Sequence, residues 1–145
     1  MRVPFESRSE LGLLLRVAHR RAAKEASEAL SPLGIEARHL GVLLVLDARG
    51  KLSQTQLVDA LGADKSGMVR TIDDLERIGA AVRQPDPGDR RARLVELTGT
   101  GRELLRSARA AADEVAGRLF GSIPDTDYEV VRRVLAAIAA LPSGS

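Results

Sequence analysis

The amino-acid sequence predicts a mainly α-helical protein with one small β-hairpin, and three observations support this prediction. Apolar residues recur at helical spacing along most of the chain. Near its middle, only Gly62 and Ala63 separate two predicted helices, which is the tight corner of a helix-turn-helix. Residues 82–98 then form two short extended runs around a Pro/Asp/Gly cluster, a pattern typical of a β-hairpin with a longer loop. This order of elements predicts a winged helix-turn-helix, with the hairpin as its wing.

Length and composition limit the classes to which the chain can belong. A chain of 145 residues is long enough for one domain, or for one small domain with a dimerisation arm. The 22 basic and 20 acidic residues give a net charge of +2, which does not by itself indicate a nucleic-acid partner. Cysteine is absent, which excludes disulfides and thiolate metal sites. No signal-like segment and no membrane-spanning apolar run occurs, so we expect a cytoplasmic protein with no membrane partner.

Two helices are predicted before the helix-turn-helix. The first spans about residues 8–30 and ends where Pro32 and Gly34 interrupt the helical pattern. The second spans roughly residues 36–48 and is apolar on nearly all sides, which is typical of a buried helix.

The two helices of the corner are marked by their terminal residues. The first of them begins at Ser53, where Ser-Gln-Thr-Gln has the form of a capping box, and it ends at Gly62. Asp64 is a strong N-cap candidate for the next helix, which ends at Gly79.

Two further helices follow the hairpin. Thr98 can cap a helix that reaches about Gly121, although Thr100 with Glu103 also fits a capping box, and Pro124 precedes the last helix. Neither helix has an obvious place inside a winged helix. We therefore expect these two helices and the first helix to form an arm, whose exposed apolar residues are covered when two copies of the chain form a homodimer. The stripes on its three helices are Leu11, Leu14, Leu15, Ala18, Ala22 and Ala26; Leu104, Ala108, Ala111, Val115 and Leu119; and Tyr128, Val131, Leu135 and Ile138. The predicted division is therefore a DNA-binding domain at residues 36–98 and a helical dimerisation region at 1–35 and 99–145.

The start of the second corner helix is the candidate for contacts in the major groove, where base edges carry the sequence code. A glycine there permits close approach of the backbone to DNA, although a solvated helix start with an indifferent glycine is the alternative. The N-terminus of the preceding helix offers backbone N–H groups to a phosphate, which is compatible with plain capping. The candidates are Lys65, Ser66, Gly67, Met68, Arg70 and Thr71 for the groove, and Ser53, Gln54 and Thr55 for the phosphate.

The hairpin carries an unusual cluster of charge. Asp89 precedes Arg90, Arg91 and Arg93, and it could hold one of these arginines in place. Arg90 and Arg91 would gain from the enhanced negative potential of a narrow minor groove. The alternative, a surface ion pair between Asp89 and Arg91, would contribute only about 0–1 kcal/mol to stability. The sequence therefore favours contact with DNA.

Residues 56–79, together with Arg83, Pro87-Gly88-Asp89-Arg90-Arg91-Ala92 and Leu97-Thr98-Gly99-Thr100-Gly101, resemble the MarR (multiple antibiotic resistance regulator) family. The resemblance implies a dimeric DNA-binding regulator, usually a repressor that a small, often aromatic or phenolic, anionic ligand releases. It also implies that Asp89 braces Arg91, which enters the minor groove. Without cysteine, the chain does not belong to the peroxide-sensing branch, and without tryptophan it lacks a feature of the urate-responsive branch.

Candidate ligand contacts lie on the first two helices. Arg16 and Arg20, one turn apart, could hold a carboxylate, and His19 and His39 could line a cavity between the arm and the winged helix. A solvated face and ordinary packing are the alternatives for these residues. We expect no metal and no cofactor, because zinc would need Asp or Glu as further ligands. No catalytic constellation is present, so we do not expect an enzyme.

The predicted function is that of a homodimeric, sequence-specific transcription regulator. Its partners would be double-stranded DNA with a pseudo-palindromic operator, a second copy of the chain, and a small anionic or aromatic ligand that releases a repressor. Two alternatives remain open at this point: a ligand-independent DNA-binding or architectural protein, and a dimeric protein-interaction module with a degenerate winged helix.

Overall fold

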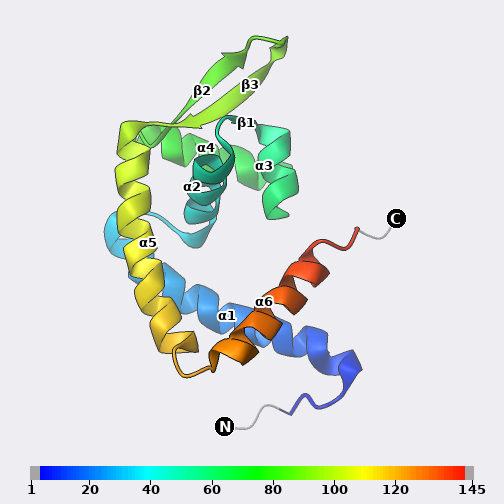
Figure 1. Ribbon diagram of the computed structural model, residues 1–145. Helices are drawn as coiled ribbons and strands as arrows, with labels where there is room; N and C mark the ends of the chain where they lie inside the picture. Colours follow the sequence, from blue (N-terminus) through cyan, green and yellow to red (C-terminus); the bar gives the residue numbers. More distant parts are fainter. Residues whose placement is uncertain (1–3, 143–145) are drawn as a thin grey trace.

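The computed structural model describes residues 4–142, which form six α-helices and a small antiparallel sheet (Figure 1). The helical first segment is divided into a short 3-10 turn and α1, and the other predicted helices agree with the structure to within one or two residues at their starts. The elements are a 3-10 turn Arg8–Glu10, α1 Leu11–Leu30, a 3-10 turn Ser31–Leu33, α2 Ala37–Arg49, β1 Leu52–Ser53, α3 Gln54–Leu61, α4 Lys65–Arg77, β2 Ala81–Asp86, β3 Asp89–Leu97, α5 Gly99–Phe120 and α6 Asp125–Ala139.

The sheet has the strand order β1-β3-β2, and both pairings are antiparallel. The sequence did not predict β1, because its two residues gain their strand partners Val95 and Leu94 from far along the chain. Together with α2, α3 and α4, the three strands make the predicted winged helix-turn-helix.

The wing differs from its prediction in the length of its loop. Only Pro87 and Gly88 separate β2 from β3, so the expected longer loop is wrong. The register shifts between Pro85 and Asp86, which allows the strands to continue almost to the tip. Pro85 is tolerated because β2 is an edge strand. Arg90, Arg91 and Arg93 consequently lie on β3 itself.

Three predicted helix caps are confirmed. Ser53 Oγ accepts from the backbone N–H of Gln56 at 3.2 Å, while Gln56 Oε1 accepts from the N–H of Ser53 at 2.8 Å, which completes the capping box of α3. Asp64 caps α4, and Thr98 Oγ1 caps α5 by accepting from the N–H of Gly101 at 3.0 Å. Of the two capping positions considered for α5, the structure uses Thr98.

One apolar core lies beneath the helix-turn-helix and includes residues outside the predicted DNA-binding segment. Leu30 at the end of α1 and Leu105 and Ala108 in α5 belong to it. The expectation that α5 has no place in the winged helix is therefore wrong for its first half, because residues four and three apart on this helix face α2 and the sheet. The division at residues 36–98 stays a prediction. The remaining buried members are Ile35, Val42, Leu43, Leu46, Leu52, Leu57, Met68, Ile72, Leu75, Ala80, Ala81, Val95 and Leu97.

The arm carries apolar side chains on its surface. α6 has no buried residue, and each member of its predicted stripe is 43–48% exposed. Leu11, Leu13 and Val17 on α1 are exposed to a similar extent. Within residues 4–142, no single helix is long and apolar enough to cross a membrane; one bent pair, Arg8–Leu33 with Ala37–Arg49, meets that criterion by length and composition alone.

Candidate nucleic-acid interface

The first turns of α4 present a polar, cationic surface. Lys65, Ser66 and Arg70 are exposed, as predicted. Ser66 Oγ donates to Asp64 Oδ1 at 3.3 Å, whereas the side chains of Lys65 and Arg70 have no hydrogen-bond or ion-pair partner among the described residues. Two cations on one helix start are therefore available to an external anion.

Met68 and Thr71, also expected in the groove, are buried instead, with 2% and 3% exposure. This is a correction with a simple cause. The helical period places both on the face that also carries Ile72 and Leu75, and that face packs on the core. Thr71 Oγ1 satisfies its hydrogen-bonding needs inside the protein by donating to the carbonyl of Gly67 at 2.9 Å.

Gly67 has a local reason to be glycine. Its N–H donates to Asp64 Oδ1, and a Cβ at this position would lie 2.7 Å from the same oxygen. A side chain would thus disturb the cap of α4. Whether the bare backbone also approaches DNA stays a prediction.

The start of α3 and the wing together enclose a cavity of about 260 Å³. This cavity brings together two sets of residues that were predicted separately: the N-terminal residues of α3 and an arginine of β3. The guanidinium groups of Arg91 and Arg93 have no partner within the described part of the chain. The lining residues are Ser53, Gln54, Thr55, Arg83, Arg91, Ala92 and Arg93.

Asp89 contacts Arg91 through the backbone. Its Oδ1 accepts from the N–H of Arg91 at 2.9 Å, and the structure records no ion pair between the two side chains in residues 4–142. The surface ion pair considered from the sequence is therefore absent there. Asp89 shapes the strand, and the guanidinium of Arg91 remains free, as does that of the exposed Arg90.

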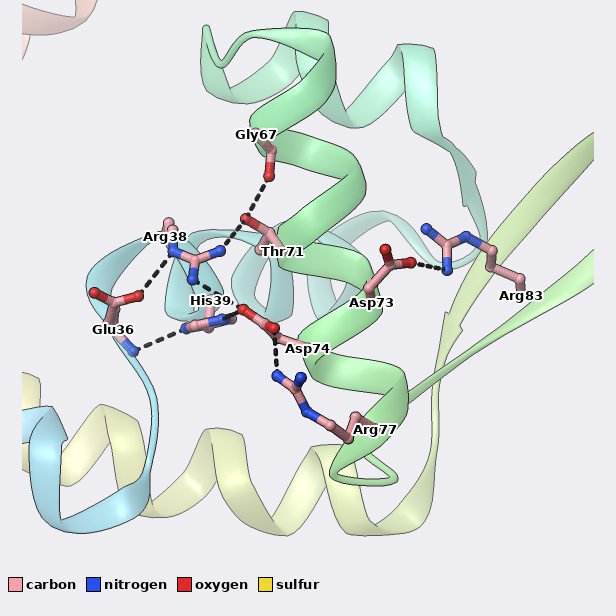
Figure 2. Close-up of polar contacts among 9 residues, drawn as sticks. All are labelled: Glu36, Arg38, His39, Gly67, Thr71, Asp73, Asp74, Arg77 and Arg83. Atoms are coloured by element: carbon pink, nitrogen blue, oxygen red, sulfur yellow. Dashed lines mark hydrogen bonds and ion pairs between the residues drawn. The ribbon is translucent and has the colours of Figure 1, made fainter.

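Behind the exposed face, a polar network joins α2 to α4 (Figure 2). Arg38 donates from Nη1 to Thr71 Oγ1 at 2.9 Å, from Nη2 to Asp74 Oδ2 at 2.9 Å and from Nε to Glu36 Oε2 at 2.8 Å. One guanidinium thus contacts the cap of α2 and two side chains of α4.

His39 belongs to the same network and is only 5% exposed. The backbone N–H of Glu36 donates to Nδ1 at 2.9 Å, so Nδ1 acts as an acceptor and the ring proton lies on Nε2. Nε2 then donates to Asp74 Oδ2 at 2.9 Å. This bond from His39, with those from Arg38 and Arg77, lowers the pKa of Asp74 to about 2, although desolvation acts in the opposite direction.

The network lines one side of a cavity of about 500 Å³ between the end of α1, the start of α2 and the end of α4. Of the predicted ligand contacts, only His39 lies there. Arg16, His19 and Arg20 are exposed on α1 and do not line it. The lining residues are Ser27, Ser31, Gly34, Ile35, Glu36, Arg38, His39, Asp74, Arg77 and Ile78.

Comparison with known proteins places these features in context. The sequence model of one protein family, described as the MarR family, matches residues 33–92. The HTH-type transcriptional repressor NicR of Pseudomonas putida is 28% identical over 120 residues, which span 83% of this chain and 76% of NicR.

Two crystal structures from Rhodococcus are similar over nearly their whole length. A MarR-family transcriptional regulator from Rhodococcus sp. RHA1 shares 33% identity and a TM-score of 0.86, with 93% of this chain and 96% of that one covered. CouR from Rhodococcus jostii RHA1, bound to p-coumaroyl-CoA, shares 33% identity and a TM-score of 0.83, with 94% and 96% covered.

Proposed function

The chain belongs to the MarR family of transcription regulators, and we propose that it acts in the cytoplasm as a homodimeric repressor of a pseudo-palindromic operator. The family assignment and the winged-helix fold predicted from the sequence are confirmed. The prediction that the chain is not an enzyme is confirmed as well, because this is a family of transcription regulators.

The observation that carries the proposal is the surface formed by cations on α4 and β3 that have no partner within residues 4–142. Lys65 and Arg70 stand at the start of the helix that would enter the major groove, where bases are distinguishable. Arg91 and Arg93 stand on the wing beside the amide groups at the N-terminus of α3. Cations left without internal partners are suited to phosphate groups, which dominate the affinity of proteins for DNA.

The exposed apolar residues of α1 and α6 support a homodimer. So many exposed apolar residues are unusual on a monomer, and a second copy would cover them by placing the same surface against itself. In this proposal residues 1–35 and 99–145 supply the interface, and residues 36–98 bind DNA.

DNA binding is tested by footprinting the DNA upstream of the gene that encodes this chain, followed by titration of the protected duplex and of random duplex at several salt concentrations. We expect a tighter complex with the protected duplex. Equal binding to both would favour an architectural protein, and no binding to either at low salt would favour a protein-interaction module.

We further infer that a small anionic ligand binds in the cavity beside Arg38 and Arg77 and thereby releases the repressor from DNA. Several observations support this site: two guanidinium groups and His39 converge on the carboxylate of Asp74, Arg38 also pairs with Glu36, and Ile35 and Ile78 add apolar surface. A ligand carboxylate would compete with Asp74 for these donors. The open cavity disfavours the ligand-independent alternative. The site at Arg16, His19 and Arg20 stays a prediction.

The ligand proposal is tested by calorimetry with p-coumarate and p-coumaroyl-CoA, the latter chosen because CouR binds it. We expect Arg77→Gln to weaken binding of either compound that binds, whereas Arg109→Gln, on α5 and outside this cavity, leaves it unchanged. Equal binding by wild type and Arg77→Gln would place the ligand elsewhere.

A further inference from the structure

Two adjacent carboxylates of α4, Asp73 and Asp74, point to different sides of the helix (Figure 2). Asp74 faces α2, as described above, whereas Asp73 faces the wing. There the Nη1 of Arg83, on β2, lies 2.8 Å from Asp73 Oδ1 and also pairs with Glu76 Oε1. The helix predicted to read the operator is therefore tied to the strand that begins the wing.

Arg83 is held more firmly than most surface cations. Its side chain is 22% exposed, and its backbone N–H also donates to Glu76 Oε2 at 3.4 Å. Asp73 and Glu76 are three residues apart, so they lie on one face of α4 and approach the guanidinium together. An arginine shared by two carboxylates in partial burial has more fixed geometry than an exposed ion pair.

The environment of Arg83 contrasts with that of its neighbours in the same cavity. Arg91 and Arg93 have no side-chain partner in the described chain and are available to phosphate. The charge of Arg83 is already matched by Asp73 and Glu76, which both pair with its Nη1, so a phosphate that approached its other N–H groups would be repelled by two nearby carboxylates.

We propose that Arg83 is a positioning residue for operator recognition: it fixes the wing against α4, so that the arginines of β3 and the start of α4 meet DNA at a set separation. This inference rests on the proposed operator binding. Arg83 then contributes to the preference for operator over random DNA and little to the general attraction for phosphate.

The test compares Arg83→Met with Arg93→Met on operator and random duplex at several salt concentrations. Arg83→Met should weaken operator binding by about tenfold and random binding by less than about twofold, with the dependence of log K on log salt unchanged. Arg93→Met should weaken both, with the salt slope smaller by about 1. An Arg83→Met that behaves like Arg93→Met, or that changes neither affinity, overturns the proposal.

The double variant Asp73→Asn with Glu76→Gln distinguishes a positioning role of Arg83 from direct contact with phosphate, because the two roles predict different changes in DNA affinity. Loss of the carboxylates releases the wing, so a positioning role predicts a smaller ratio of operator to random affinity. If Arg83 instead contacts phosphate, the freed guanidinium binds operator and random DNA more tightly alike, which overturns the proposal.

Hydrogen exchange of the free protein separates the failure of this proposal from the failure of operator binding. Arg83→Met should accelerate exchange of the β2 and β3 amides at an unchanged Tm, whereas Arg93→Met should not. Unchanged exchange in Arg83→Met overturns the positioning role, whether or not wild type prefers the operator. A wild type without operator preference would instead overturn the proposed function.

Discussion

Asp74 accepts hydrogen bonds from His39, Arg38 and Arg77, which lower its pKa to about 2. Because of this low pKa, the stability of the fold should depend on pH. A carboxyl whose pKa is lower in the folded than in the unfolded state stabilises the fold at pH above its unfolded value, near 4, and this contribution is lost as pH falls towards 2. We expect the urea midpoint of wild type to fall more between pH 5 and pH 3 than that of Asp74→Asn. The control is Asp59→Asn, at an exposed carboxyl of α3, which should follow wild type; an Asp74→Asn that also follows wild type would contradict the prediction.

Arg91 and the cations of α4 should differ in what their loss does to DNA binding. In the proposed complex Arg91 contacts phosphate and the minor groove, which carries little base identity. Arg91→Ala should therefore lower affinity for operator and random duplex alike and decrease the salt slope by about 1. At least one alanine variant of Lys65, Ser66 and Arg70 should lose roughly 1–3 kcal/mol on the operator and much less on random DNA. Titration of both duplexes at several salt concentrations measures this, and an unchanged Arg91→Ala would remove the wing from the DNA interface.

For single residues, the sequence predicted those contacts that a residue makes with the adjacent turn of the same helix. Ser53 and Asp64 were identified as caps because their partners lie three residues on. The sequence did not predict the contacts of Arg38 with Asp74 and of Arg83 with Glu76. These partners lie 36 and 7 positions apart on different elements, so they leave no local pattern in the sequence. For Met68 the helical period predicted the core face, although the residue was also a candidate for the groove, and the structure buries it.

Among the elements, α5 depends on one capping residue with two functions. Thr98 Oγ1 accepts from the N–H of Gly101 and donates to the carbonyl of Gly79 at 2.6 Å, which joins α5 to the turn after α4. Thr98→Ala should cost about 1–2 kcal/mol in the free energy of unfolding, because a cap and a tertiary bond are both lost. Thr98→Ser keeps the hydroxyl and should retain most of the stability in urea denaturation; equal losses in the two variants would argue against this role.

The elements that the sequence described incompletely are those whose form depends on distant strands and helices. β1 exists because β3 offers it partners, and the wing has a short loop because cross-strand pairing extends to Asp86 and Asp89. The apolar stripe of α5 was visible, but the core that includes Leu105 and Ala108 is completed by residues of α1, α2 and the sheet. Periodicity indicates that a face is buried without indicating what buries it.

For the whole molecule, the apolar surface of α6 predicts an assembly that a single substitution can weaken. Leu135 is 43% exposed in the single chain and lies within the stripe of α6. Leu135→Asp should shift the protein towards monomer in sedimentation and weaken operator binding in parallel, because a charge would be buried at the two-fold interface. Arg133→Glu changes charge outside the stripe and serves as the control. A wild type that sediments as a folded monomer at micromolar concentration would rule out this assembly.

The two-fold symmetry of the proposed homodimer would also set the geometry of the operator. Two copies of α4 on one dimer should read half-sites about one helical turn apart, roughly 10 bp centre to centre or a multiple of that. Operator variants with inserted base pairs should lose affinity at half a turn and regain part of it at a full turn. Protection of one isolated half-site by a dimer would contradict this arrangement.

The close contact at the start of α5 has a mechanical consequence for that spacing. Gly101 is buried against the carbonyl of Ala80, where any Cβ would collide with the backbone, and Thr98 fastens the same point to Gly79. α5 therefore behaves as a lever whose fulcrum is the turn directly after α4. Its 22 residues extend for about 33 Å, so a tilt of about 5° at the fulcrum displaces the far end by roughly 3 Å. We therefore expect any rotation of α4 to be accompanied by a larger shift at the far end of α5, because the contact at Gly101 leaves no room for a side chain.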